Sequence, residues 1–67
     1  MTTIMLNGKS TELTTSQKLN DLIQQFCKNP QHVIAEVNGE IIKSPEWNEI
    51  SLKNGDQIEL VSFVGGG

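Results

Sequence analysis

Two Asn-Gly pairs restrict the fold more than any other feature of this sequence. A two-residue type I′ turn needs positive φ at both central positions, and Asn-Gly is a pair that tolerates this conformation. The pairs are Asn7-Gly8 and Asn38-Gly39. Short apolar runs flank both of them, at 3–6 and 11–13 around the first pair and at 33–37 and 41–42 around the second. The sequence therefore predicts two antiparallel β-hairpins.

A helix is predicted between the two hairpins. Its apolar residues recur at i, i+3, i+4, i+7 and i+8, which is the spacing of one helix face. They are Leu19, Leu22, Ile23, Phe26 and Cys27. Ser16 is a candidate N-cap, and Asn29-Pro30 is expected to end the helix because proline does not continue it. The apolar face is expected to pack on a sheet.

The last third of the chain supplies the remaining elements. Pro45-Glu46-Trp47 predicts a turn or a short helical piece, with Trp47 filling the side of the core opposite the helix. Asn54-Gly55-Asp56 then turns the chain into an alternating strand over 57–64. This order predicts an α+β, ubiquitin-like β-grasp domain over 1–64, a mixed sheet of about four to five strands with one main helix packed across it. Strands one and five are expected to lie parallel at its centre.

Three glycines, Gly65-Gly66-Gly67, follow the last strand directly. Glycine loses more backbone entropy on ordering than any other residue, so such a run is unsuited to stabilising a fold. We expect residues 65–67 to form a flexible tail, about 10 Å long when extended. Such a tail could carry its carboxylate into a narrow cleft of another protein. The alternative is a frayed terminus or a spacer.

The last strand is predicted to be apolar on both of its faces. Ile58 and Leu60 alternate inward, which turns Val61 and Phe63 outward. Ile34, in the third strand, has the same outward parity. An exposed apolar patch of Ile34, Val61 and Phe63 beside the tail predicts a partner-docking surface. The alternative is that Phe63, near the strand end, covers the rim of the core.

Composition argues against several classes of function. A net charge of −3 argues against nucleic-acid binding, which needs a basic patch. The single cysteine excludes an internal disulfide and an iron–sulfur cluster. Without a basic region or a long apolar stretch at the N-terminus, no signal peptide or membrane span is expected, and the cytoplasm is the default compartment. His32 has no neighbour at a metal-ligand spacing and Cys27 lies in the apolar stripe, so we expect neither a metal site nor an enzyme.

The chain resembles the ThiS family, the sulfur carrier proteins of thiamin biosynthesis, over about its full length. The segments that carry the resemblance are Leu6-Asn7-Gly8, Leu19-Asn20-Asp21-Leu22-Ile23, Val37-Asn38-Gly39-Glu40-Ile41-Ile42 with Trp47 after it, and Asn54-Gly55-Asp56-Gln57-Ile58-Glu59-Leu60 leading into Phe63-Val64-Gly65-Gly66-Gly67. The third terminal glycine is a departure, since a bare diglycine is more usual in the family.

The resemblance implies a mechanism at the C-terminus. A ThiF-like adenylyltransferase would use ATP to adenylate the Gly67 carboxylate, with Gly65 and Gly66 threading its site. A sulfur donor system, a persulfide charged by a cysteine desulfurase, would then give a thiocarboxylate, and thiazole synthase (ThiG) would accept the sulfur. ATP and magnesium would belong to the partner, so the chain itself is expected to bind no cofactor and to be a monomer when free.

Two alternatives stay open on the sequence. The small subunit of molybdopterin synthase shares the terminal diglycine and its chemistry but serves a different acceptor. Length and the turn-to-tail segment from Asn54 favour the thiamin branch. A plain β-grasp interaction module, with the glycines as a spacer, is the more distant alternative.

Overall fold

The computed structural model describes residues 2–15 and 17–63 of the chain. Its elements are β1 (Thr2–Leu6), β2 (Lys9–Leu13), α1 (Leu19–Phe26), the 3-10 helix η1 (Pro30–His32), β3 (Val33–Val37), β4 (Glu40–Ile42), the 3-10 helix η2 (Ser44–Glu49) and β5 (Gln57–Ser62). The predicted order of strands and helix is confirmed, and the turn or short helical piece predicted around Trp47 is η2.

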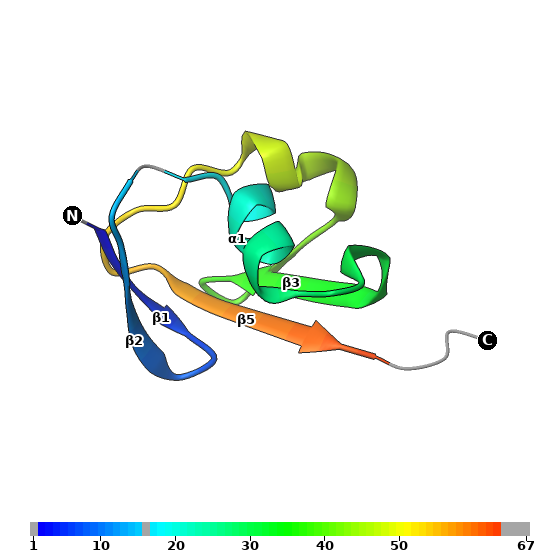
Figure 1. The fold of residues 1–67 in the computed structure, drawn as a ribbon, viewed down its shortest axis with the longest axis horizontal. Coiled ribbons are helices and arrows are strands. Elements are labelled where there is room, and N and C mark those ends of the chain that lie inside the picture. Colours follow the sequence, from blue (N-terminus) through cyan, green and yellow to red (C-terminus); the bar gives the residue numbers. More distant parts are fainter. Residues whose placement is uncertain (1, 16, 64–67) are drawn as a thin grey trace.

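All the strands belong to one mixed sheet in the order β2-β1-β5-β3-β4. β1 and β5 run parallel, whereas the pairs β1·β2, β3·β4 and β3·β5 are antiparallel. The predicted parallel pairing of the first and last strands is therefore confirmed, with β5 in the middle of the sheet. Helix α1 crosses one face (Figure 1), which gives the α+β, β-grasp architecture predicted from the sequence.

Both Asn-Gly pairs form the predicted hairpin turns. Asn7 and Gly8 have φ of 50° and 82°, and Asn38 and Gly39 have φ of 52° and 86°. These left-handed values are strained for most side chains and tolerated by asparagine and glycine. The turns fix the register of β1 against β2 and of β3 against β4, and so decide which side chains point to the core.

The two turn asparagines also hold the central strand. The Leu60 amide donates to Asn7 Oδ1 at 2.8 Å, and Asn7 Nδ2 donates to the Leu60 carbonyl oxygen at 3.2 Å. Likewise the Gln57 amide donates to Asn38 Oδ1 at 3.0 Å. Each asparagine side chain therefore forms hydrogen bonds with the backbone of β5, in addition to the bonds between strands. The turns of both hairpins are thereby attached to this strand.

The core lies between the sheet and α1. Its fully buried large side chains are Ile4, Leu19, Leu22, Ile23 and Ile58. Val33 and Ala35 are buried from β3, and Leu60 packs against the cluster while half-buried. The inward parity predicted for Ile58 and Leu60 agrees with these positions. The opposite face of the sheet, which we call the open face, has no helix over it among the described residues (Figure 1).

Helix α1 ends earlier than the sequence predicts. The prediction that Asn29-Pro30 ends it is wrong, because the backbone is already extended at Cys27 and Pro30 opens η1 instead. At the other end the N-cap is Lys18, whose amide donates to Asp21 Oδ2 at 3.0 Å. The candidate N-cap Ser16 lies outside the described residues.

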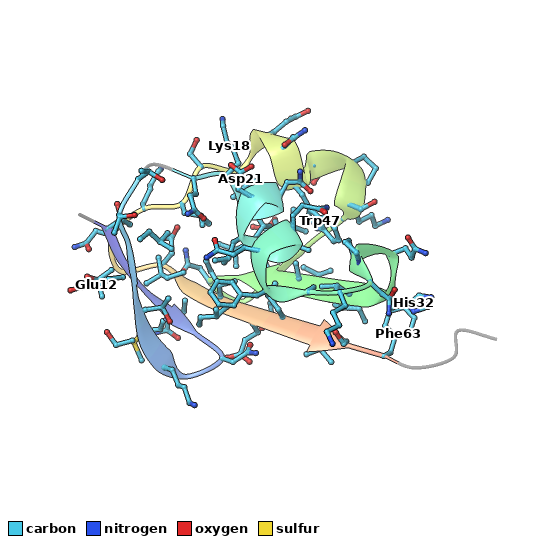
Figure 2. The ribbon with its side chains drawn as sticks, in the orientation of Figure 1. Glu12, Lys18, Asp21, His32, Trp47 and Phe63 are labelled. Carbon is cyan, nitrogen blue, oxygen red and sulfur yellow. The ribbon has the colours of Figure 1, made fainter. Side chains whose placement is uncertain are left out.

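Trp47 lies on the helix side of the sheet, so the prediction that it fills the side opposite the helix is wrong. It belongs to η2, which packs beside α1 (Figures 1 and 2), and its side chain is buried in the core. Its indole Nε1 donates to the Ile42 carbonyl oxygen at 2.9 Å. The indole thus covers the core at the C-terminal end of the edge strand β4.

The last strand is shorter than the predicted 57–64. It ends at Ser62, and Phe63 is the last residue that the structure describes. The domain boundary predicted after Val64 and the tail of Gly65, Gly66 and Gly67 lie outside the described residues.

Candidate docking surface and carboxyl terminus

The open face of the sheet carries an apolar patch across β3, β4 and β5. Ile34 and Val61 are direct cross-strand partners and are 46% and 54% exposed. Ile41 of β4 is 63% exposed and lies in the same shallow hollow. Two of the three residues predicted to form a docking surface are therefore side by side, and Ile41 extends the patch. Strand alternation could have indicated such a residue, because only one of the neighbours Ile41 and Ile42 can point to the core.

Acidic and polar side chains line the same hollow. The complete lining is Ile34, Glu36, Gly39, Ile41, Gln57, Glu59 and Val61. Glu36 and Glu59 are direct cross-strand partners two register positions from Ile34 and Val61, which makes them the next pair on the same face. The hollow therefore combines an aliphatic floor with two carboxylates.

Phe63 lies in a different hollow from Ile34 and Val61. Its amide donates to the His32 carbonyl oxygen at 2.9 Å, and the two rings pack with their centroids 5.6 Å apart. Figure 2 shows both side chains together at the end of β5. The hollow they share is also lined by Phe26 and Cys27 at the C-terminal end of α1. Phe63 is 41% exposed, as predicted, but the structure does not place it in the hollow of the other two candidates.

Phe26 is a candidate surface residue that the helix periodicity does not predict. Its spacing puts it in the apolar stripe of α1, yet it is 52% exposed. The cause is the early end of the helix, because Phe26 is its last residue and the chain turns away into extended backbone directly afterwards. Together with Phe63 it makes the rim beside the end of β5 aromatic.

The described residues offer no catalytic constellation. Burial raises the pKa of the Cys27 thiol, which disfavours the reactive thiolate form. No cluster of three or more His, Cys, Asp and Glu side chains is placed to hold a metal ion within 2–15 and 17–63. Over the same residues, no helix has the length and apolar character needed to cross a bilayer. Phe63, the last described residue, precedes Gly67 by four residues in the sequence.

Comparison with known proteins gives a consistent result. A model of the ThiS family matches residues 4–67. The sulfur carrier protein ThiS of Bacillus subtilis is 37% identical to this chain, over 96% of the chain and 98% of that protein. A thiazole synthase of Paramagnetospirillum magneticum is 27% identical over 96% of the chain, a match that spans 20% of the synthase.

A solved structure shares the fold. The crystal structure of the thiamine biosynthesis protein ThiS from Geobacter metallireducens superimposes with a TM-score of 0.83, covering 97% of this chain and 99% of that one at 26% identity. The match includes nearly every residue of both chains, so the two proteins share one fold over nearly their whole length.

Proposed function

The chain belongs to the ThiS family and is a sulfur carrier of thiamin biosynthesis, and we propose that it carries the sulfur as a thiocarboxylate on Gly67. The observation that supports this most is the extent of the family match, which runs to the last residue and so includes Gly65, Gly66 and Gly67. In this proposal the chain is a substrate of other enzymes and supplies no catalytic side chain.

The first step activates the carboxylate. A carboxylate is a poor electrophile because it is charged and has no good leaving group. An adenylyltransferase of the ThiF type would let a Gly67 oxygen attack the α-phosphorus of ATP, which forms the acyl-adenylate and releases pyrophosphate. The glycines suit this step, because residues without Cβ can pass a narrow cleft and adopt whichever φ it requires. We propose the cytoplasm as the compartment, where ATP is available for this activation.

The second step exchanges oxygen for sulfur. A persulfide sulfur of the donor system attacks the acyl carbon, and AMP leaves with the former carboxylate oxygen. The product is an acyl disulfide. A thiol then reduces its S–S bond, so the terminal sulfur stays on Gly67 as the thiocarboxylate and the donor sulfur ends in a new disulfide.

Thiazole synthase is the proposed acceptor of this sulfur. The synthase of Paramagnetospirillum magneticum supports this, because one stretch of its own polypeptide resembles nearly the whole of the present chain. A carrier-like segment within an acceptor enzyme keeps the two at a high effective concentration. The same observation favours the thiamin branch over molybdopterin synthase.

The exposed apolar side chains are proposed to dock these partners. Ile34 and Val61 offer an aliphatic patch on the open face, and Phe63 offers an aromatic one at the end of β5. Both lie near the strand that leads to Gly67. Exposed apolar patches on a protein surface are typical of interaction sites.

An ATP–pyrophosphate exchange assay with the partner adenylyltransferase tests the proposal. The wild-type chain should support exchange, and a chain lacking Gly67 and Gly66 should not. Gly66→Val should also block exchange although it keeps the carboxylate, because a β-branched residue restricts φ and adds bulk in the cleft. Exchange at the wild-type rate with Gly66→Val would show that the glycines are not required for access.

A further inference from the structure

The open face places two carboxylates directly opposite each other. Glu36 of β3 and Glu59 of β5 are cross-strand partners, and both line the hollow that contains Ile34 and Val61. Like charges at directly opposed positions of an antiparallel pair destabilise the sheet. An opposite-charge or β-branched pair at these two positions would contribute more to the sheet than two glutamates do.

The hollow holds no compensating cation. Among the described residues that line it, the remaining members are aliphatic, glycine or glutamine, and none is a lysine or histidine. The five basic residues of the chain lie at 9, 18, 28, 43 and 53, none of which lines this hollow. Within the described part of the chain, no side chain that lines the hollow therefore supplies a positive charge to the two carboxylates.

We propose that Glu36 and Glu59 recognise a positive charge of thiazole synthase within its docking site on this chain. The synthase would insert one arginine or lysine side chain between the two carboxylates. This inference rests on the proposed function. The synthase side chain would be flanked by apolar groups that cover Ile34, Ile41 and Val61. The two opposed carboxylates of the hollow favour a basic side chain as the occupant, and a thiazole synthase is the partner because one such enzyme contains a segment similar to this chain.

Docking would turn an unfavourable pair into a favourable one. A basic side chain between the carboxylates removes their mutual repulsion and forms charge-assisted hydrogen bonds, which are roughly twice as strong as neutral ones. The surrounding aliphatic side chains exclude water from the contact. Complementary charge of this kind also speeds encounter and rejects partners whose facing surface is acidic.

The test compares two double variants of the full-length chain. Glu36→Gln with Glu59→Gln removes both carboxylates from the hollow. Glu46→Gln with Glu49→Gln is the matched control, because it removes two exposed carboxylates from η2, away from the hollow. Binding of each to purified thiazole synthase is measured by titration calorimetry at low and high salt, and thermal unfolding is measured on each chain alone.

The open-face variant should bind about tenfold or more weakly, and its binding should depend less on salt, whereas the control should bind nearly as the wild type does. The open-face variant should also unfold at the same temperature as the wild type or higher, because a repulsive pair has been removed. Weaker binding in a chain of unchanged or greater stability is a result that a structural role would not produce.

Equal losses of binding in both variants, or a loss explained by lower stability, would overturn the inference. A wild-type chain that acquires the thiocarboxylate but does not bind the synthase overturns the inference and leaves the carboxyl-terminal chemistry intact. A wild-type chain that never acquires sulfur overturns the proposed function, and the titration still decides whether the acid pair binds the synthase.

Discussion

The two faces of the β3·β5 pair carry similar aliphatic side chains in very different surroundings. On the face below α1, Ile58 is 0% exposed and Val33 is 8% exposed. On the open face, Ile34 is 46% exposed and Val61 is 54% exposed. The alternation of a strand assigns each residue to a face, but the layer above that face decides whether an aliphatic side chain stabilises the fold.

The energetic difference between the faces follows from burial. Removing a valine, leucine or isoleucine side chain fully from water contributes about 1.5–3 kcal/mol. The half-exposed side chains of the open face receive only part of that contribution while the chain is free. They can receive the remainder when a partner covers them, which is why we assign the covered face to folding and the open face to docking.

The largest effect is expected on the covered face. Ile58→Ala should lower the free energy of unfolding by about 2–5 kcal/mol, because it leaves a cavity beside α1 in the middle strand. Leu60→Ala should cost less, since Leu60 is half-buried at the margin of the core. Urea denaturation of both variants measures the difference. If Ile58→Ala lowers the free energy of unfolding no more than a surface substitution does, the position assigned to the core is wrong.

A smaller loss of stability is expected where the first hairpin turn is hydrogen-bonded to β5. Asn7→Gly keeps a residue that tolerates positive φ but removes two hydrogen bonds to Leu60. We expect a loss of about 1–2 kcal/mol, since a hydrogen bond contributes about 0.5–1.5 kcal/mol net. The measurement is thermal unfolding, with Asn54→Gly as a control that removes the single bond from the Thr3 amide. Equal losses of stability in the two variants would mean that the two hydrogen bonds to Leu60 contribute no more than the single bond from the Thr3 amide.

On the open face, Val61→Ala should change stability by no more than about 0.5 kcal/mol, the range of ordinary surface substitutions. It should instead weaken binding to the partner enzymes, because it removes contact area without opening a cavity. Phe63→Ala should behave in the same way, although Phe63 lies in a separate hollow. If either variant melts as early as Ile58→Ala, the assignment of that residue to the surface is wrong.

The smallest effect concerns Cys27, at the margin of the covered face. Burial raises its thiol pKa, so the folded chain holds this proton to higher pH than the unfolded chain does. Stability is therefore unaffected below the ordinary thiol pKa and falls slightly as the pH rises above it. Alkylation by iodoacetamide should show a higher apparent pKa in the native chain than in urea. The same apparent pKa in both states would mean that the thiol is fully solvated.

Local sequence signals predict the scaffold well. The Asn-Gly pairs identify both hairpins because few other residues adopt positive φ at two consecutive positions. Strand parity then identifies Ile58 as buried and Ile34 and Val61 as exposed, since side chains alternate strictly along a strand. These features depend on neighbours in sequence, and this is why they can be read from it.

Features that depend on tertiary arrangement are not predicted. Phe26 has the spacing of a core residue, but the helix ends there and leaves its ring exposed. Trp47 lies on the helix side because η2 packs beside α1, which no local pattern indicates. Phe63 likewise lies in a different hollow from Val61 and packs on the ring of His32, which comes from a distant segment.

The most direct test of the whole account is the mass of the C-terminal peptide in protein purified from its own cells. The account predicts a fraction heavier by the difference between one sulfur and one oxygen atom, with fragmentation placing the change on Gly67. The same peptide from the Gly66→Val variant should carry oxygen only. A wild-type chain that supports thiazole formation while Gly67 never carries sulfur would contradict the assignment of the chemistry to the carboxyl terminus.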